Sequence, residues 1–286
     1  MGAWDAWIGR EITVNDRLET ALAHRWLATF DLPPLSEGPM PQGVHLCLCT
    51  PETPTARLGS DGHPVRDDSP DSFLPPIALP RRMWAASNTT FVAPIPVGAR
   101  IERTSRIASI AEKEGSSGPL GFVDIEHVTM ADGNEAVREI QTLVYRDAAA
   151  PDAPFSPPET DAGRFDGTAW DVVETRAPGS ALLFRYSALT FNTHRIHYDW
   201  PYAREVERYR GLVVHGPLIA SMLLRLAALQ CGENSLARFA FRALSPAIAG
   251  EVLHLAMRRD RRSGEVEMGA FADDGRQVTK ATASLA

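Results

Sequence analysis

Residues 191–200, FNTHRIHYDW, place two histidines, an arginine, an asparagine and an aspartate close together, and His215 follows in GLVVHGPL. Such side chains can bind a metal ion, exchange protons with a substrate, or hold a loop by hydrogen bonds. Zinc ligands more often come from i, i+4 positions of one helix or from two spaced pairs, whereas His194 and His197 are three residues apart. We therefore expect no metal here.

The remaining alternatives for the histidines are structural and catalytic. For His194 and His215, a buried imidazole with satisfied hydrogen bonds is at least as well supported as a catalytic role. His197 lies five residues after Asn192, in a loop that leads to an apolar helical segment. Catalytic groups are common on loops held against a rigid element, so His197 is the better acid/base candidate.

The apolar segment at 216–232, GPLIASMLLRLAALQCG, predicts the clearest helix in the chain. Pro217 suits the first helical position and Gly232 suits the stop. Only Ser221, Arg225 and Gln230 are polar between them, so the helix should be buried on nearly all sides.

Upstream, the pattern predicts a helix over 15–30, capped by Asn15 or Asp16. A Pro-rich irregular excursion follows at 50–80, and alternating apolar and polar residues at 84–145 predict an antiparallel meander.

Two blocks of the chain are repeated in the same order. Residues 90–105 match 241–257, and 130–145 match 271–286. The matched positions are Pro94 with Pro246, Gly98 with Gly250, and the turn Asp132-Gly133 with Asp274-Gly275. Two copies of one unit, each a helix wrapped by an antiparallel sheet, predict an α+β double hotdog whose sheets join edge to edge. We expect an N-terminal unit at 1–147, a linker at 148–165 and a C-terminal unit at 166–286.

The composition indicates a globular protein, with 286 residues, 44% hydrophobic and 23% charged. A net charge of −7 argues against a nucleic-acid partner. We expect no membrane span, because the apolar stretch at 212–229 is broken by polar residues, and no secretory signal. Three cysteines, an odd number, favour a reducing compartment and a cytoplasmic location.

FNTHRIHYD followed by YRGLVVHGPL resembles the hydratase 2 motif of MaoC-like (R)-specific enoyl-CoA hydratases and 3-hydroxyacyl-thioester dehydratases. In the first half, LGSDGHP, LPPIALPRRMWA, KEGSSGPLGFV and LVYRD resemble the two-domain members, which include mesaconyl-C4-CoA and itaconyl-CoA hydratases. The resemblance covers nearly the whole chain. It implies reversible hydration of a short enoyl-CoA, branched or dicarboxylic, to a 3-hydroxyacyl-CoA.

Laid on this chain, the family motif puts its catalytic histidine on His197 and its closing His-Gly on His215-Gly216. Its catalytic aspartate falls on Asn192, which cannot exchange a proton. Either His197 acts alone, taking a proton from water and returning it to Cα while Asn192 orients the water, or Asp199 replaces the missing carboxylate. The Gly216 N–H, at a helix N-terminus, should stabilise the enolate oxygen.

Arg195 stands where the family more often has proline. It either pairs with Asp199 or Glu205, or meets a carboxylate on the acyl chain. Arg82 is a second candidate for that carboxylate or for the phosphates of CoA.

Two other functions compete: a hotdog acyl-CoA thioesterase and a non-catalytic acyl-thioester binding protein. The first half has no counterpart of FNTHRIH and should supply the wall of the substrate tunnel without being catalytic. Acid/base chemistry on an acyl-CoA substrate implies no metal or organic cofactor, and analogy with the fold suggests a homodimer.

Overall fold

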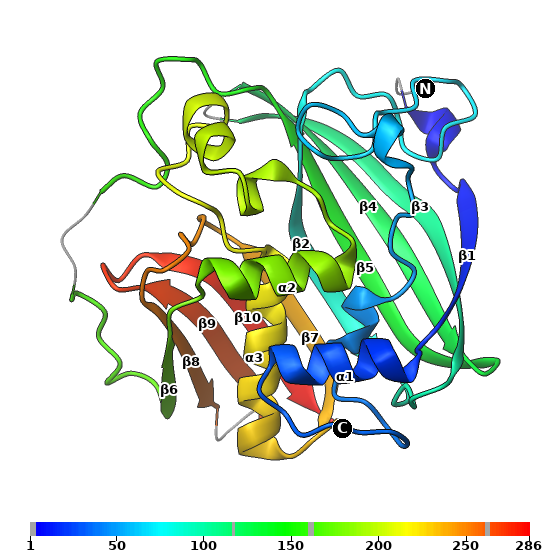
Figure 1. Cartoon of the computed structure of the whole chain (residues 1–286), viewed down its shortest axis with the longest axis vertical. Helices are drawn as coiled ribbons and strands as arrows, with labels where there is room; N and C mark the ends of the chain where they lie inside the picture. The colour runs from blue at the N-terminus through cyan, green and yellow to red at the C-terminus, as the bar shows by residue number, and fades with distance from the viewer. Residues whose placement is uncertain (1–3, 116–117, 160–162, 261–263) are drawn as a thin grey trace.

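The computed structural model describes residues 4–115, 118–159, 163–260 and 264–286, and its ten strands form one antiparallel sheet (Figure 1). The order across the sheet is β1-β3-β4-β5-β2-β7-β10-β9-β8-β6. The strands are β1 (Glu11–Arg17), β2 (Arg81–Phe91), β3 (Arg100–Gly115), β4 (Gly118–Ala131), β5 (Asn134–Arg146), β6 (Val172–Arg176), β7 (Leu236–Ala243), β8 (Leu253–Arg259), β9 (Val266–Ala272) and β10 (Gln277–Leu285).

The sheet consists of two halves that meet where β2 pairs with β7, from Ala86 opposite Arg242 to Thr90 opposite Arg238. This pairing confirms the predicted edge-to-edge junction. The predicted hairpin turns also form: Asp132 and Gly133, between β4 and β5, have φ of 48° and 82°, and Gly275, between β9 and β10, has φ of 83°. A positive φ is the reason that Asp-Gly suits such turns.

The described residues form three α-helices: α1 (Thr20–Thr29), α2 (Ser180–Thr190) and α3 (Gly216–Cys231). Helix α3 packs on β7, β8 and β9, and α1 packs on α2. Helix α3 has Pro217 in its first turn and ends at Gly232, as predicted. Nine of its sixteen residues are buried, among them Leu218 and Leu223, which are fully inaccessible. Among the described residues, no helix is long and apolar enough to span a membrane.

Five shorter helical turns complete the elements. They are η1 (Asp5–Trp7), η2 (Val44–Cys47), η3 (Thr55–Arg57), η4 (Arg195–His197) and the π-helical η5 (Tyr202–Val206). By chain order, η2 takes the place in the first half that α3 takes in the second. The two halves therefore share one long, deeply buried helix.

The prediction of a helix from residue 15 was wrong at its start. Asn15 and Asp16 lie in β1, which pairs with β3 over its whole length, and α1 begins at Thr20. The backbone hydrogen bonds of this edge pairing outweigh the capping preference of Asn and Asp. Helix α2 and strand β6 were not predicted. Of the expected linker, residues 160–162 lie outside the described residues.

The Pro-rich excursion after α1 packs on the loop that follows α2. Thr193 Oγ1 donates to the Gly62 carbonyl at 2.6 Å, and the Arg195 backbone N–H donates to the Asp61 carbonyl at 2.9 Å. Gly62 has φ of +86°, and a Cβ there would lie 1.9 Å from the Thr193 carbonyl oxygen. Only glycine therefore allows this contact between the two halves of the chain.

The contact at Gly62 yields a prediction of stability. Replacing Gly62 by Ala should destabilise the fold by at least about 2 kcal/mol, because steric overlap adds to the cost of a positive φ. Gly98→Ala is the matched control, since Gly98 has φ of +87° and open space around its Cβ position. It should cost about 1 kcal/mol. Denaturant unfolding measures the free energy of unfolding of both variants. Equal losses of this free energy would contradict a tight contact at Gly62.

Candidate active site

A cavity of about 350 Å³ lies between the two halves of the chain. The second half contributes Asn192 and Thr193 from the loop after α2, and His215 and Pro217 from the start of α3. The first half contributes His63 and Pro64 from the excursion, and Arg82, Trp84, Arg103, His127 and Gln141 from β2 to β5. Among the described lining residues, none is an aspartate or a glutamate.

His197 is buried at the end of η4; it is not itself among the lining residues but stacks at 3.6 Å on His215, which lines the cavity. Its Nδ1 lies 2.7 Å from the Val213 carbonyl oxygen, which can only accept, so Nδ1 carries the proton and Nε2 keeps a lone pair. Burial, with a smaller contribution from His194, lowers the pKa of His197 to about 3. The imidazole is therefore neutral at pH 7, in the form that can accept a proton.

His197 belongs to a row of four imidazoles. Ring centroids are 4.0 Å apart for His63 and His194, 5.6 Å for His194 and His197, and 3.6 Å for the stacked His197 and His215. His215 Nε2 lies 2.9 Å from Ser187 Oγ. The row connects the excursion of the first half to the N-terminus of α3.

Asn192 lies at the cavity wall, where the family motif has its catalytic aspartate. Its Oδ1 accepts a hydrogen bond from the His194 backbone N–H at 2.9 Å. The side chain therefore caps the turn that carries His194, and its NH2 group is the part able to bind a water or a substrate oxygen.

Asp199 and Arg195 are bound to each other and are not among the residues that line the cavity. Arg195 Nη2 lies 2.7 Å from Asp199 Oδ2, and its guanidinium lies over the Tyr202 ring. Asp199 Oδ1 accepts the Tyr202 N–H at 3.1 Å, and this bond together with Arg195 lowers the pKa of Asp199. Of the alternatives for Arg195, the structure has the ion pair with Asp199.

Of the other two expected binding residues, Arg82 lines the cavity and Gly216 lies between the lining residues His215 and Pro217. Gly216 opens α3, and a Cβ built on it would meet no atom within 4 Å, so a ligand can approach its backbone N–H. Arg82 is part of the lining, on β2.

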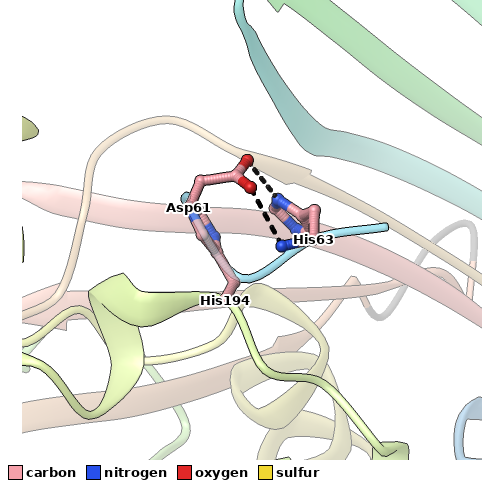
Figure 2. A group of neighbouring side chains, drawn as sticks. All are labelled: Asp61, His63 and His194. Atoms are coloured by element: carbon pink, nitrogen blue, oxygen red, sulfur yellow. Dashed lines mark hydrogen bonds and ion pairs between the residues drawn. The ribbon is translucent and has the colours of Figure 1, made fainter. Parts of the chain in front are cut away.

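Sequence reasoning missed Asp61 and His63. Figure 2 shows both Asp61 carboxylate oxygens facing His63, with His194 beside them. Asp61 Oδ2 lies 3.0 Å from His63 Nδ1, and Oδ1 accepts the His63 backbone N–H at 3.0 Å. Burial alone would raise the pKa of Asp61, but the hydrogen bonds and charge of His63 outweigh it and lower the pKa to about 2. The signal was an Asp-Gly-His sequence inside a Pro-rich loop.

The same three residues include donor types that bind zinc, and their ligand atoms lie within 4.8 Å of one another. However, the Asp61 to His63 contact at 3.0 Å needs a proton on Nδ1, and Asp61 already accepts two hydrogen bonds. The geometry is that of an Asp–His pair in which the carboxylate fixes the tautomer.

Comparison with known proteins identifies the family of the chain. The family model "Hydroxyacyl-thioester dehydratase type 2" matches residues 43–249. The chain is 38% identical to mesaconyl-C(4)-CoA hydratase of Chloroflexus aurantiacus, over 99% of this chain and 98% of that protein.

Two solved structures share the fold. A MaoC-like dehydratase from Phytophthora capsici has a TM-score of 0.71 at 13% identity, covering 97% of this chain and 96% of that one. A Mycobacterium tuberculosis protein with a double hotdog fold has a TM-score of 0.58 at 11% identity, covering 97% and 96%. The fold is therefore the predicted double hotdog. The chain belongs to the hydroxyacyl-thioester dehydratase type 2 family of MaoC-like hotdog hydratases.

Proposed function

We propose that the protein is a hydro-lyase that reversibly hydrates a short enoyl-CoA to a 3-hydroxyacyl-CoA. The observation that carries the proposal is the neutral His197, whose Nδ1 is held by the Val213 carbonyl while Nε2 keeps its lone pair. A base of this kind, next to an acyl-sized cavity and a helix N-terminus, has the parts that the addition of water requires.

In the hydration direction, His197 Nε2 removes a proton from water while the water oxygen bonds to Cβ. Negative charge then develops on the thioester oxygen. The Gly216 N–H, at the positive end of α3, would donate to that oxygen, and Asn192 would orient the water through its NH2 group. These steps need no metal and no organic cofactor.

The acyl group that fits the cavity best carries a second carboxylate. Arg103 donates to the carbonyls of Leu48 and Cys49, and its Nε is buried with no hydrogen-bond partner in the described structure. Arg82 lines the same cavity, whose described lining residues include no carboxylate. Two guanidinium groups without an acidic partner favour an anionic ligand. We therefore assign the distal carboxylate of a C4 or C5 dicarboxylic enoyl-CoA, such as mesaconyl-CoA or itaconyl-CoA, to Arg82 and Arg103.

A thioesterase and a non-catalytic binding protein remain the competing functions. A thioesterase would aim its activated water at the carbonyl carbon, and the His-Gly before α3 is the hydratase's motif. One assay separates the three: free thiol appears only on hydrolysis, the enoyl absorbance falls only on hydration, and neither changes on binding alone.

We also propose where the protein works, its oligomeric state and its domain boundaries. Cys47, Cys49 and Cys231 are all free thiols, which supports a reducing cytoplasm. A homodimer is proposed by analogy with the fold, and light scattering measures it. We retain the units 1–147 and 166–286 joined by 148–165.

His197 is the first residue to test. His197→Gln should lower kcat on the true substrate by about 10²- to 10⁴-fold, because glutamine cannot take a proton from water. Hydration is followed as loss of the enoyl absorbance, with thermal unfolding to show that the variant is folded.

Two variants serve as controls for that test. Asn192→Asp should stay within about tenfold of wild type, since the position handles water rather than a proton, and Asp199→Asn should leave chemistry intact on a folded protein. A His197→Gln enzyme with near wild-type kcat would remove His197 from the mechanism.

Arg82 tests the substrate class. Arg82→Gln should lower kcat/KM for a dicarboxylic enoyl-CoA by about 100-fold and leave crotonyl-CoA within about threefold, because only the former loses a charge pair. Arg195→Lys is the matched control, since Arg195 holds a loop and its loss should affect both substrates equally. Equal losses on both substrates in Arg82→Gln would exclude Arg82 from carboxylate recognition.

A further inference from the structure

Hydration needs two proton transfers, one from water and one to Cα, and the inference below rests on the proposed function. Of the residues that the family motif points to, Asn192 has no exchangeable acid proton, and Asp199 is bound by Arg195 away from the cavity. The second transfer therefore falls either to His197 again or to a group that the motif does not include.

His63 is such a group. Its side chain is one-quarter exposed and lines the cavity, on the opposite half of the chain from His197. It stacks on His194 at 4.0 Å, and His194 in turn contacts His197 at 5.6 Å. Two imidazoles from two halves of the chain thus lie on one continuous row beside one cavity.

Asp61 prepares His63 for proton exchange. The bond from Nδ1 to Asp61 Oδ2 leaves Nε2 as the ring atom that can serve a substrate. The pair is also held firmly, because the carbonyls of Asp61 and Gly62 accept bonds from Arg195 and Thr193. Such a carboxylate-supported imidazole, fixed by further hydrogen bonds, is what proton transfer requires.

We propose that His63 is a second catalytic residue, which exchanges the proton at Cα, and that Asp61 is the positioning residue that holds it. The Asp61–His63 pair thus supplies the proton-exchanging group that Asn192 cannot provide. The N-terminal half, which the sequence suggested to be non-catalytic, contributes half of the acid/base chemistry.

The steps balance as follows. His197 Nε2 takes one proton from water, the water oxygen bonds to Cβ, and the Cα=Cβ electron pair moves to form the enolate. Protonated His63 gives its Nε2 proton to Cα, and the thioester carbonyl is restored. His197 has then gained the proton that His63 has lost, and proton exchange with solvent returns both rings to their starting forms.

The test compares two Asp–His pairs in the full-length protein. His63→Ala should lower kcat for hydration by about 10²- to 10³-fold with KM little changed. Added imidazole should raise the kcat of that variant at least tenfold. Asp61→Asn should lower kcat by at least about tenfold. The control pair is His254 and Asp273, at the same 3.0 Å separation but among the residues outside the cavity lining. His254→Ala and Asp273→Asn should stay within about threefold of wild type.

The wild-type enzyme is assayed first, so a protein that hydrates no enoyl-CoA refutes the proposed function rather than the role of His63. With an active wild type, three results would overturn the inference. They are a His63→Ala enzyme within threefold of wild type, a loss that imidazole does not rescue, and equal losses in the control pair. Loss of wild-type activity after dialysis against a chelator would also overturn it, in favour of a metal at Asp61, His63 and His194.

Discussion

The pairing of β2 with β7 is the interaction on which the rest of the molecule depends. Five residue pairs, from Ala86 with Arg242 to Thr90 with Arg238, join the two halves of the sheet and satisfy backbone groups that would otherwise form two exposed edges. Within the joined sheet, the nearly all-apolar α3 packs on β7, β8 and β9. The N-terminus of α3 then lies where the excursion of the first half can meet the loop of the second, and that meeting encloses the cavity.

The electrostatics of the site follow from this enclosure. Burial lowers the pKa of both His194 and His197 to about 3, so most of the imidazole row is uncharged at neutral pH. Asp61 stays ionised at one end because His63 supplies two hydrogen bonds to it. The site therefore combines buried neutral rings with one ionised carboxylate, and the Nε2 lone pair of His197 is unprotonated.

The sequence predicted the features that local pattern controls. The repeats at Pro94 and Pro246, the Asp-Gly turns and the boundaries of α3 all depend on backbone preferences of nearby residues. The start of α1 was missed because β1 is stabilised by β3, some ninety residues away.

The site residues also fall into those that a local motif predicts and those that only tertiary contacts bring in. His197, Asn192, His215 and Gly216 follow from one local motif. Asn192 and His215 line the cavity, and His197 stacks on His215. His63 and Arg103 line that cavity from the other half of the chain, and Asp61 holds His63 there. The Asp-Gly-His sequence marks a loop, but only tertiary contacts bring that loop to the cavity. The ion pair of Arg195 with Asp199 was one of two alternatives that spacing alone could not separate.

The steric fit of Gly62 against Thr193 also bears on how the protein folds. These residues are about 130 positions apart, and closing so long a loop costs entropy that is repaid only once both halves have formed. During synthesis, the excursion with Asp61 and His63 is made long before the loop that receives it. The Asp–His pair therefore reaches its place in the imidazole row late, and recovery of activity on refolding reports the docking of the excursion on the loop after α2.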